Sequence, residues 1–468
     1  MTFKKIICLV FALALMVSVM SACGSDKNKN PSTSSTADGS SEEGTVSFLT
    51  PSVDPGSIYA DPNWSPYTNM PASSKGATVR VAHWTDLTQS AFFSSPLKTI
   101  YNDIGINVEM YLVKNDGYVN EIMTKLAAGD IPDVFKTNEY NAAFPVTLQI
   151  AAPVNKVSSV DLNDPIWDQT MLKSATIDGN TYYLTTIGYP GTNGNVVFFN
   201  KRLFEENSIK SPTEYYAEGT WSWDNFLKCS KEIKMLGSNY HGAYVNMEVL
   251  AGSVGASITK YDFNTHQFTS GLDDPELLKA YQWFANSRAQ GLLDANLLHF
   301  LDGKAGLYVY DGTHGLQKDG KWKNMDPNDI GFTYLPSFEE GKNGVFSSIY
   351  GALGIIDGAP NADAAGYFIR YYMDPKNWDL ENAFITVESG NFFFEIIKTP
   401  SSDKYFNFDD PLTFLIGQID ADKAFYDKLR NIPSEGMNTA LQSLANVVDE
   451  ACLKANDIIN NKIVEDRQ

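Results

Sequence analysis

Cysteine and histidine are scarce in this sequence, which contains four cysteines and five histidines among 468 residues. Cys8 lies within an apolar leader and Cys23 directly after it, whereas Cys229 and Cys452 each fall on the apolar face of a predicted helix. Cysteines in such positions are buried thiols more often than disulfides or metal ligands. We therefore expect no disulfide framework and no metal site. The histidines are dispersed, at His83, His241, His266, His299 and His314.

Sequence signatures of catalysis are also missing. The chain has no H-E-x-x-H, C-x-x-C, P-loop or EF-hand pattern, and it lacks the G-x-S-x-G of serine hydrolases. Acidic pairs are numerous among 56 Asp and Glu residues, but no pair is distinguished by its spacing. The sequence therefore predicts a protein that is not an enzyme and that uses no cofactor.

Positive charge is in deficit. The 36 Lys and Arg residues are outnumbered by the acidic ones, and the formal net charge is −20. A body with this charge is repelled by nucleic acid and by anionic lipid. We expect no nucleic-acid partner, and we expect a membrane to hold the protein only through an anchor.

A long hydrophobic run occurs only near the start of the chain, where Lys4 and Lys5 precede apolar residues 6–20. The run is too short for a comfortable membrane span and has the layout of a secretory signal. The small residues before Cys23 resemble the lipobox of bacterial lipoproteins, so we expect a lipoprotein signal peptide over 1–22 and lipidation of Cys23. The alternative is a plain secretory signal that is cleaved nearby.

Two segments behind the leader have compositions that cannot build a core. Residues 23–44 are rich in Ser, Asn, Asp and Gly, which predicts a disordered tether. Residues 45–76 are rich in Pro, Ser and Asn. We expect them to form an extended N-terminal arm, with Trp64 and Tyr67 as its contacts with the body.

Alternating strand and helix patterns begin at residue 78. Strands are predicted over 78–82 and 106–113, each followed by a helix, and a short apolar strand follows at 134–135. Gly129 and Pro132 end the second helix. This strand–helix–strand–helix–strand order predicts an α/β unit with a mostly parallel sheet and helices on its faces.

Polar loops follow the first and third of these strands. His83-Trp84-Thr85-Asp86 comes after the first, and Thr137-Asn138-Glu139-Tyr140 comes after the third. Ligands of open α/β sheets bind beyond the carboxyl ends of the strands, so we expect both loops to open on one edge. Most surface loops bind nothing, and an ordinary polar loop is the alternative for each.

Later segments continue the mixed pattern. Helices are expected after three capping residues, and strands are expected in the Val/Phe/Tyr-rich runs between them. The caps are Ser222, Asp274 and Asn361, the strands are 196–199, 307–310 and 347–356, a loop is expected over 311–315, and a last helix carries Met437 to Ile459.

Five collinear segments resemble motifs of the extracellular solute-binding proteins of bacterial ABC importers, the sugar-type class that includes maltose-binding protein. Leu126 to Phe135, LAAGDIPDVF, resembles the "AAGDxPDV" corner of that family. The other four are DGNTY at 178–182, FFNKRLF at 198–204, TWSWDNF at 220–226 and DGKAGLY at 302–308. Beyond them, Ser347 to Ile356 looks like the family's Gly-rich strand before the helix at Asn361. The matches extend over about 80–375, and their shared order is more specific than any one of them.

The resemblance implies a two-lobed periplasmic-binding-protein-like fold of type II, with a mainly parallel sheet in each lobe and hinge crossings between the lobes. Lobe one would comprise 77–186 and 354–400. Lobe two, with the hinge segments, would comprise 187–353 and 401–468. The Gly-rich stretch 187–194 would be one crossing, and another would lie near Gly351 to Gly354.

The resemblance also implies a function. The chain would be a monomeric, lipid-anchored receptor on the outer face of the bacterial cytoplasmic membrane. It would capture a carbohydrate, expected to be an oligosaccharide, by hinge closure and deliver it to ABC permease subunits. Lys136 and Thr137 stand where many family members have an aromatic residue, so ring stacking has to come from elsewhere.

Candidate ligand-binding residues combine aromatic rings, which cover the C–H faces of a sugar, with polar groups that pair its hydroxyls. From lobe one they are Trp84, Asp86, Asn138, Glu139 and Tyr140; at the crossing, Tyr189 and Asn193; and from lobe two, Asn246, Glu248, Asp311, His314 and Tyr350. His314 could equally be a loop histidine without a ligand. Trp221 and Trp223 are expected to pack the helix that begins there.

Two other functions remain open on the sequence. The same fold could bind a peptide, a polyamine or a phosphorylated compound, although the candidate site contains no Lys or Arg for a phosphate. A secreted glycan-cleaving enzyme is the third hypothesis, and it would need two carboxylates flanking one bond.

Overall fold

The computed structural model describes most of the chain between residues 53 and 392 and part of a C-terminal helical stretch. The described residues are 53–90, 93–114, 118–137, 149–177, 179–186, 189, 193–256, 258–262, 265, 267–318, 320–339, 348–349, 351–380, 383–386, 388–392, 441–442, 444–450, 452–453 and 456–457. The predicted signal peptide with Cys23, the tether and the first residues of the arm lie outside these ranges.

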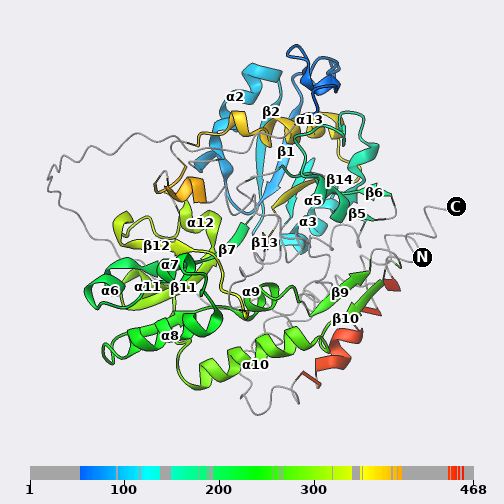
Figure 1. Ribbon diagram of the computed structural model, residues 1–468. Coiled ribbons are helices and arrows are strands. Elements are labelled where there is room, and N and C mark those ends of the chain that lie inside the picture. The colour runs from blue at the N-terminus through cyan, green and yellow to red at the C-terminus, as the bar shows by residue number, and fades with distance from the viewer. Residues whose placement is uncertain are drawn as a thin grey trace, which may run out of the picture.

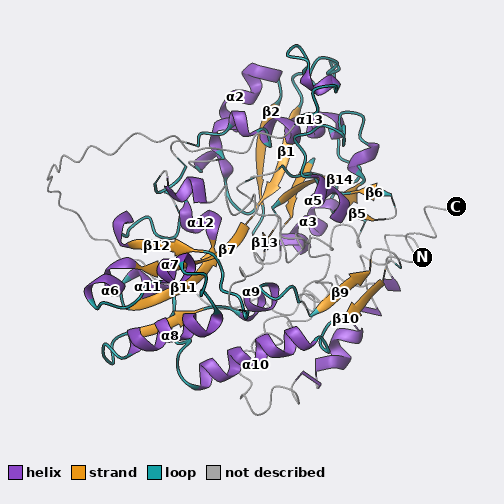
Figure 2. Ribbon diagram, in the orientation of Figure 1, coloured by secondary structure: helices purple, strands orange, loops and turns teal. Residues whose placement is uncertain are grey.

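Two sheets organise the described part of the chain, one in each lobe (Figures 1 and 2). The lobe-one sheet has the order β2-β1-β3-β14-β4, with β1 Thr78–His83, β2 Asn107–Leu112, β3 Val134–Thr137, β4 Ala151–Ala152 and β14 Ala352–Ile356. The lobe-two sheet has the order β12-β7-β11-β8, with β7 Asn193–Asn200, β8 His241–Tyr244, β11 Ala305–Asp311 and β12 Ile330–Thr333. A short strand, β13 Ser348–Ile349, pairs with β7 beside the main path.

Helices surround both sheets. Those of lobe one are α2 Ser94–Ile104, α3 Tyr118–Ala127, α5 Gln169–Ser174 and α13 Ala362–Tyr372. Those of lobe two are α6 Lys201–Glu206, α7 Pro212–Ala217, α8 Trp223–Lys234, α9 Met247–Gly252, α10 Pro275–Ala289, α11 Leu297–Leu301 and α12 Gly312–Leu316. There are also two strand pairs in the described part of the chain: β5 Thr176–Ile177 with β6 Asn180–Thr181, and β9 Thr259–Asp262 with β10 Gln267–Ser270. The short 3-10 turns are η2 Ile58–Ala60, η3 Leu87–Gln89, η4 Val154–Lys156, η5 Pro327–Asp329 and η6 Pro375–Asn377.

The predicted strand–helix–strand–helix–strand unit is confirmed as β1, α2, β2, α3 and β3. β1 pairs in parallel with β2 and with β3. The expectation of mainly parallel sheets is wrong for lobe two, where β7 is antiparallel to β11, β12 and β13, and only β8 and β11 are parallel. The reason is that β7 enters the lobe from the crossing and runs away from it, whereas β8 and β11 run toward it.

The corner at 129–133 fastens three parts of lobe one together. Gly129 has a φ of 76°, in the left-handed region that ends the helix α3. Asp133 is fully buried, and its two carboxylate oxygens accept hydrogen bonds from the backbone N–H groups of Arg80, at 2.9 Å, and Asn361, at 2.7 Å. Asp130 accepts from the Tyr111 hydroxyl at 2.6 Å and pairs with Arg80 at 2.8 Å. The motif therefore joins β1 and β2 to the start of α13.

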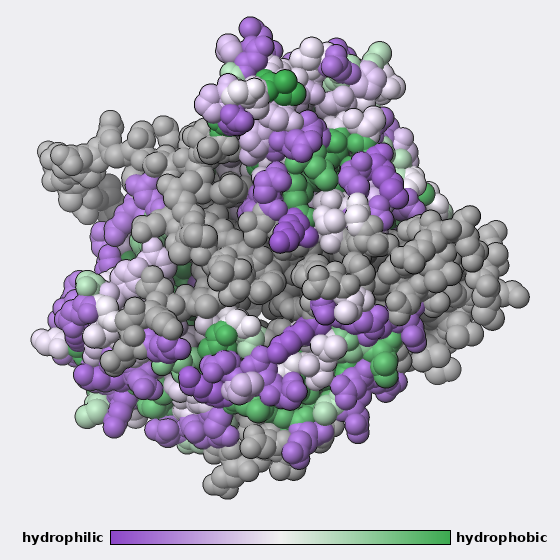
Figure 3. All heavy atoms as spheres, turned by 45° about the vertical axis from the view of Figure 1, so that its right-hand side comes forward, coloured by the Kyte–Doolittle hydropathy of each residue, from purple (hydrophilic) through white to green (hydrophobic). Residues whose placement is uncertain are grey.

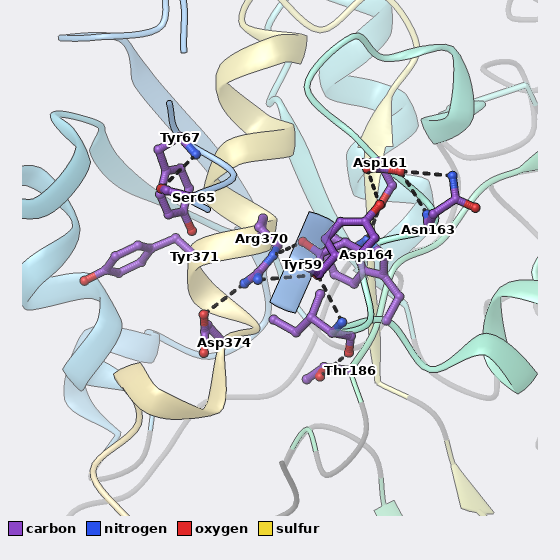
Figure 4. A network of polar contacts seen from close by, with 12 residues as sticks. Tyr59, Ser65, Tyr67, Asp161, Asn163, Asp164, Thr186, Arg370, Tyr371 and Asp374 are labelled. Carbon is purple, nitrogen blue, oxygen red and sulfur yellow. Dashed lines mark hydrogen bonds and ion pairs between the residues drawn. The ribbon is translucent and has the colours of Figure 1, made fainter. Parts of the chain in front are cut away.

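The N-terminal arm packs on lobe one beside a buried network of charges (Figure 4). The Tyr59 hydroxyl donates to Asp161 at 2.7 Å, and the Tyr67 ring lies 6.2 Å from the Tyr371 ring. Behind these contacts, Arg370 bridges Asp164 at 2.5 Å and Asp374 at 2.9 Å. The predicted contact through Tyr67 is thus present, while Trp64 packs against Tyr59 within the arm, with ring centroids 5.0 Å apart.

Lobe two has an aromatic core around α8 and β11. Trp221 and Trp223 are 4% and 0% exposed, so the expectation that they pack their helix is confirmed. Ser222 caps α8 by accepting from the Asn225 N–H at 3.3 Å, as predicted. Cys229 on α8 and Cys452 are both buried, and neither forms a disulfide, as expected for these two thiols.

Two boundaries differ from those expected. Residues 312–316 form α12 where a loop was expected. Residues 383–392 were assigned to lobe one, but Ile385 N–H donates to Leu316 of α12 at 2.9 Å, and Phe392 packs on Phe332 of β12 at 4.8 Å. The chain has therefore returned to lobe two by about residue 383, because its hydrogen-bonding partners there belong to that lobe.

The C-terminal helical residues close the edge of the β9–β10 hairpin. Leu441, Leu444, Val448 and Cys452 are buried against the lobe-two core. The Asn456 side chain accepts from the backbone N–H of Phe268 at 2.6 Å and donates to its carbonyl at 2.9 Å. One amide side chain thus satisfies both backbone groups that a neighbouring strand would otherwise pair.

The surface is mostly polar on the face shown in Figure 3, where hydrophilic atoms surround smaller apolar patches on both lobes. Within the described ranges, no helix combines the length and the apolar composition that crossing a membrane requires.

Candidate functional site

Two chain segments cross between the lobes side by side. On the return crossing, Ile349 pairs with Asn193 of lobe two, and Ala352 pairs with Thr137 of lobe one. Only residues 350 and 351 separate these two pairings. The segment that leads from lobe one to lobe two lies beside this return crossing. Its residue Leu184 exchanges backbone hydrogen bonds of 2.9 and 3.0 Å with Leu353 of β14.

The crossing brings the ligand-facing edges of both sheets together. In lobe one, β1 and β3 end at this point, and β14 begins there opposite Thr137. In lobe two, β11 ends with Asp311 opposite Asn195, close to the start of β7. Ligands of α/β sheets bind beyond the carboxyl ends of strands. The carboxyl ends of β1 and β3 and the end of β11 therefore lie near the crossing, whereas the loop after β3 lies outside the described residues.

Trp84 is the central side chain of the lobe-one edge. It is half-buried and follows directly after β1. Its ring stacks on His83 with centroids 4.8 Å apart, meets Tyr118 edge-on at 5.2 Å, and has the Nζ of Lys136 4.6 Å from its centroid. A tryptophan held in this way offers a fixed apolar surface beside a positive charge.

Tyr118 lies beneath Trp84 and links the two strands that end here. Its hydroxyl donates to the Ala82 carbonyl at 2.9 Å and accepts from the Lys136 N–H at 3.1 Å. Tyr118 is 4% exposed. Burial raises the pKa of its hydroxyl far above the ordinary value, so the group is neutral and can both donate and accept.

Asp86 orders the loop after β1. Its carboxylate accepts hydrogen bonds from the backbone N–H of Thr88 at 3.0 Å and from the Thr88 hydroxyl at 2.6 Å, which caps η3. The carboxylate is half-buried and retains acceptor capacity beyond these two bonds. Asp86, two residues after Trp84, therefore fixes the turn at η3.

The lobe-two edge combines polar and aromatic groups. Asn246 is the N-cap of α9, and its side chain accepts from the Val249 N–H at 2.8 Å. Tyr244 and Tyr308 stack with centroids 4.5 Å apart on the parallel strands β8 and β11. Asp311, at the end of β11, is half-buried. The amide N–H groups of Asn246 and the carboxylate of Asp311 are groups that can pair hydroxyls.

Tyr189 requires a correction. It was predicted to meet the ligand at the crossing, but it is 1% exposed and packs against Phe93, Tyr372 and Trp378 with centroid distances of 5.8, 6.1 and 6.3 Å. The flanking glycines and proline gave it the appearance of a loop residue. Aromatic packing instead places the ring in the core, where it is not accessible to a solute in this conformation.

The remaining candidates cannot be placed by their side chains. Asn138, Glu139, Tyr140 and Tyr350 lie outside the described residues, and Asn193, Glu248 and His314 are described by backbone alone, in β7, α9 and α12.

Two residues at the lobe-one edge were missed by the sequence analysis. Lys136 was noted only as the replacement for an aromatic residue, yet its ammonium lies over Trp84. Tyr118 was missed because it lies one residue before the apolar stripe that begins at Val119, and nothing in the pattern indicates its hydroxyl contacts. Elsewhere in the described ranges, no group of three or more His, Cys, Asp or Glu side chains is arranged to hold a metal ion.

A scan against protein families matches residues 84–377 to the bacterial extracellular solute-binding protein family. No curated protein sequence matches the chain.

Solved structures share the fold at low sequence identity. The binding protein of B. animalis subsp. lactis, in complex with β-1,6-galactobiose, is 17% identical with a TM-score of 0.58, over 80% of this chain and 98% of its own. The sugar-binding protein MalE of Xanthomonas citri is 15% identical with a TM-score of 0.57, over 82% and 99%. The GacH receptor of Streptomyces glaucescens, solved without ligand and with acarbose, is 15% identical with a TM-score of 0.53, over 82% and 98%.

Proposed function

The chain belongs to the bacterial extracellular solute-binding protein family, and from that premise we propose that it captures an oligosaccharide between its lobes and delivers it to an ABC permease. The observation that carries the proposal is the short crossing. Two residues separate the pairing with Thr137 in lobe one from the pairing with Asn193 in lobe two. A solute bound at one edge would therefore be within reach of the other.

The chemistry of the lobe-one edge suits a sugar. The half-buried Trp84 ring can cover the C–H face of a pyranose, and the Asp86 carboxylate and the Thr85 hydroxyl lie in the same loop. A buried sugar hydroxyl that finds no partner costs about 1–3 kcal/mol, so a site of this kind selects by pairing every hydroxyl. The saccharides in the structures of GacH and of the B. animalis protein support a carbohydrate as the solute class.

The same edge disfavours a polyamine. A polycationic solute would be repelled by the ammonium of Lys136, whose Nζ lies 4.6 Å from the centroid of the Trp84 ring. A peptide remains the second candidate, because its backbone could use the same hydroxyl-pairing groups. The glycan-cleaving enzyme is the third candidate.

A thermal-shift screen tests the solute class. The panel comprises maltotriose, β-1,6-galactobiose, mannitol, a tripeptide and spermidine, each measured against protein alone. A ligand at 100 times its Kd adds about 2.7 kcal/mol to the free energy of unfolding. We expect a raised melting temperature with an oligosaccharide. If only the tripeptide or only spermidine raises the melting temperature, that compound and not a sugar is the solute. If the protein shortens an oligosaccharide during incubation, it is a glycan-cleaving enzyme.

Capture would proceed by closure of the lobes about the two crossings. Closure requires that the ligand bind the closed form better than the open one. Small-angle scattering should then give a smaller radius of gyration with the saccharide than without it. An unchanged radius at saturation would argue for a rigid site.

The protein would be held at the outer face of the cytoplasmic membrane by lipid on Cys23. The basis for this proposal is the run of small residues before Cys23 and the tether-like sequence that follows it. Mass spectrometry of the mature N-terminus decides between this and a plain secretory signal. A peptide that starts elsewhere and carries no lipid would exclude the anchor.

A further inference from the structure

The Tyr118 hydroxyl bonds to both strands at the last pair of the ladder between β1 and β3. The paired residues are Val81 with Val134 and Ala82 with Phe135. In a parallel ladder the pair of Ala82 with Phe135 places the Lys136 N–H opposite the Ala82 carbonyl. The hydroxyl of Tyr118 bonds to both of these groups, accepting from the first at 3.1 Å and donating to the second at 2.9 Å.

The Tyr118 hydroxyl bonds next to the two side chains that form the lobe-one edge. Trp84 follows Ala82 by two residues, and Lys136 is itself the donor to Tyr118. The Tyr118 ring also contacts the Trp84 ring, with centroids 5.2 Å apart and planes at 88°. Tyr118 therefore touches both strands through its hydroxyl and the tryptophan through its ring.

A neutral hydroxyl is the group that this position requires. One backbone group is a donor and the other an acceptor, and both lie in a buried place where an unpaired polar group is costly. A hydroxyl satisfies both at once because it donates one bond and accepts another. Phenylalanine would fill the same space and make neither bond.

We infer that Tyr118 is a positioning residue of the solute site. Its hydroxyl links the ends of β1 and β3, and this link sets the place of Trp84 and of the Lys136 ammonium over its ring. The consequence for binding rests on the proposed function. The consequence for the position of Trp84 does not.

The test is Tyr118→Phe, compared with Tyr371→Phe as a matched control. Both tyrosines are 4% exposed, and both hydroxyls have two partners, because Tyr371 contacts Thr99 and Asp103. Tyr371 lies on α13, and neither of its hydroxyl partners belongs to the site. Both variants lose one buried hydroxyl and keep the ring, so we expect similar falls in melting temperature.

The first readout follows Trp84 without any ligand. The protein is labelled with 5-fluorotryptophan, and the fluorine resonance of Trp84 is assigned from its loss in Trp84→Phe. We expect this resonance to shift in Tyr118→Phe and to stay in place in Tyr371→Phe. A resonance that does not move in Tyr118→Phe overturns the inference, because the hydroxyl then does not determine the position of the ring.

The second readout is the affinity for maltotriose and β-1,6-galactobiose, measured by calorimetric titration. We expect Tyr118→Phe to weaken binding of the recognised saccharide at least tenfold and Tyr371→Phe to change it less than twofold. A shifted resonance with unchanged affinity overturns the role in the site. If the wild-type protein binds neither saccharide, the choice of solute is wrong, and the fluorine spectrum still decides whether Tyr118 positions Trp84.

Discussion

Lobe one is fastened internally by buried charges, whereas the described ion pairs of lobe two are at least partly exposed to solvent. The side chains of Arg370 and Asp164 in lobe one are 11% and 5% exposed, and those of Lys234 and Asp294 in lobe two are 29% and 32% exposed. Asp133 of lobe one is fully buried as well. Lobe two is held chiefly by rings, such as Trp223 with Trp283 at 5.2 Å.

The difference shows how each lobe obtains its shape. A buried ion pair is directional and fixes the relative position of the segments that supply it, at a large cost in desolvation. Aromatic packing is less directional and contributes mainly buried area. Lobe one is built from separate parts of the chain: the N-terminal arm, the segment from β1 onward, and β14 with α13, which the chain reaches after passing through lobe two. Arg370, Asp164 and Asp133 stand at those junctions.

The largest effect is expected from Arg370→Ala. The change leaves Asp164 and Asp374 buried without their guanidinium, and breaking a buried pair in this way costs about 3–5 kcal/mol. Acid should reduce the loss, because the stranded carboxylates can then take up protons. Urea unfolding of the variant and the wild type at pH 7 and pH 5 measures both effects. A loss that is equal at the two pH values would mean that packing, not charge, holds the junction.

Trp223→Ala is the counterpart in lobe two. Trp223 is fully buried, and its removal should cost about 3 kcal/mol or more through lost apolar contact and the cavity left behind. No charge is stranded, so the loss should be the same at pH 7 and pH 5. Urea unfolding under both conditions is the measurement. A marked pH dependence would remove the distinction between the two lobes.

The site edge gives the third prediction, which concerns affinity. Trp84→Ala should weaken binding of the recognised saccharide by about 1–3 kcal/mol, or roughly 5- to 150-fold, on the scale of a truncated anchor residue. Its melting temperature should fall only modestly because the ring is half-buried. Calorimetric titration and thermal unfolding give the two values. Wild-type affinity together with a large fall in melting temperature would show that Trp84 serves the core.

The sequence predicted the order of elements better than the direction of strands. Apolar spacing identified the unit over 78–137, and capping residues identified the starts of α8 and α10, with Asp274 accepting from Glu276 N–H at 2.9 Å. These signals are local. The antiparallel direction of β7 and β14 depends on where the chain crosses between lobes, and local spacing carries no such information.

The candidate site shows the same limit. Trp84 was predicted as a site residue from its position after a strand end; the structure places it directly after β1, and its role stays a prediction. The same kind of reasoning misplaced Tyr189, whose flanking Gly and Pro gave no sign that Phe93 and Tyr372 would surround it. Tyr118 could not be found, because its role arises from a hydroxyl placed between two strands that are distant in sequence.

Asn246 allows the lobe-two edge to be tested. Its side chain already caps α9, so Asn246→Ala should lower the free energy of unfolding by about 1 kcal/mol, whereas Asn246→Asp should preserve the cap. If Asn246 also binds the solute, the aspartate variant should lose affinity while keeping stability, because it lacks the amide donors. Unfolding and titration of both variants separate the two roles. Unchanged affinity in both would restrict Asn246 to capping.

The smallest effect is expected at an exposed charge of lobe one, Asp130. The Tyr111 hydroxyl, followed by Arg80, lowers the pKa of this carboxyl below its ordinary value. Burial, together with the bond to Asp130, raises the pKa of Tyr111 to about 12, so the hydroxyl remains a donor throughout the acid range. A depressed carboxyl pKa contributes stability that is complete above the unfolded value, about 3.9, and is lost as the pH falls through the folded value.

Tyr111→Phe should therefore lower stability by a constant amount between pH 5 and pH 8, and the gap from the wild type should narrow below about pH 4. Urea unfolding across this range is the measurement. The control is Tyr101→Phe, on an exposed tyrosine of α2, which should show no gap. Arg80 still pairs with Asp130 at 2.8 Å in the variant, so the pKa should rise only part of the way. A gap that persists undiminished to pH 3 would show that the hydroxyl stabilises the fold by packing alone. Of the two charged contacts of lobe one that are tested, only the buried network at Arg370 would then contribute to stability in a pH-dependent way.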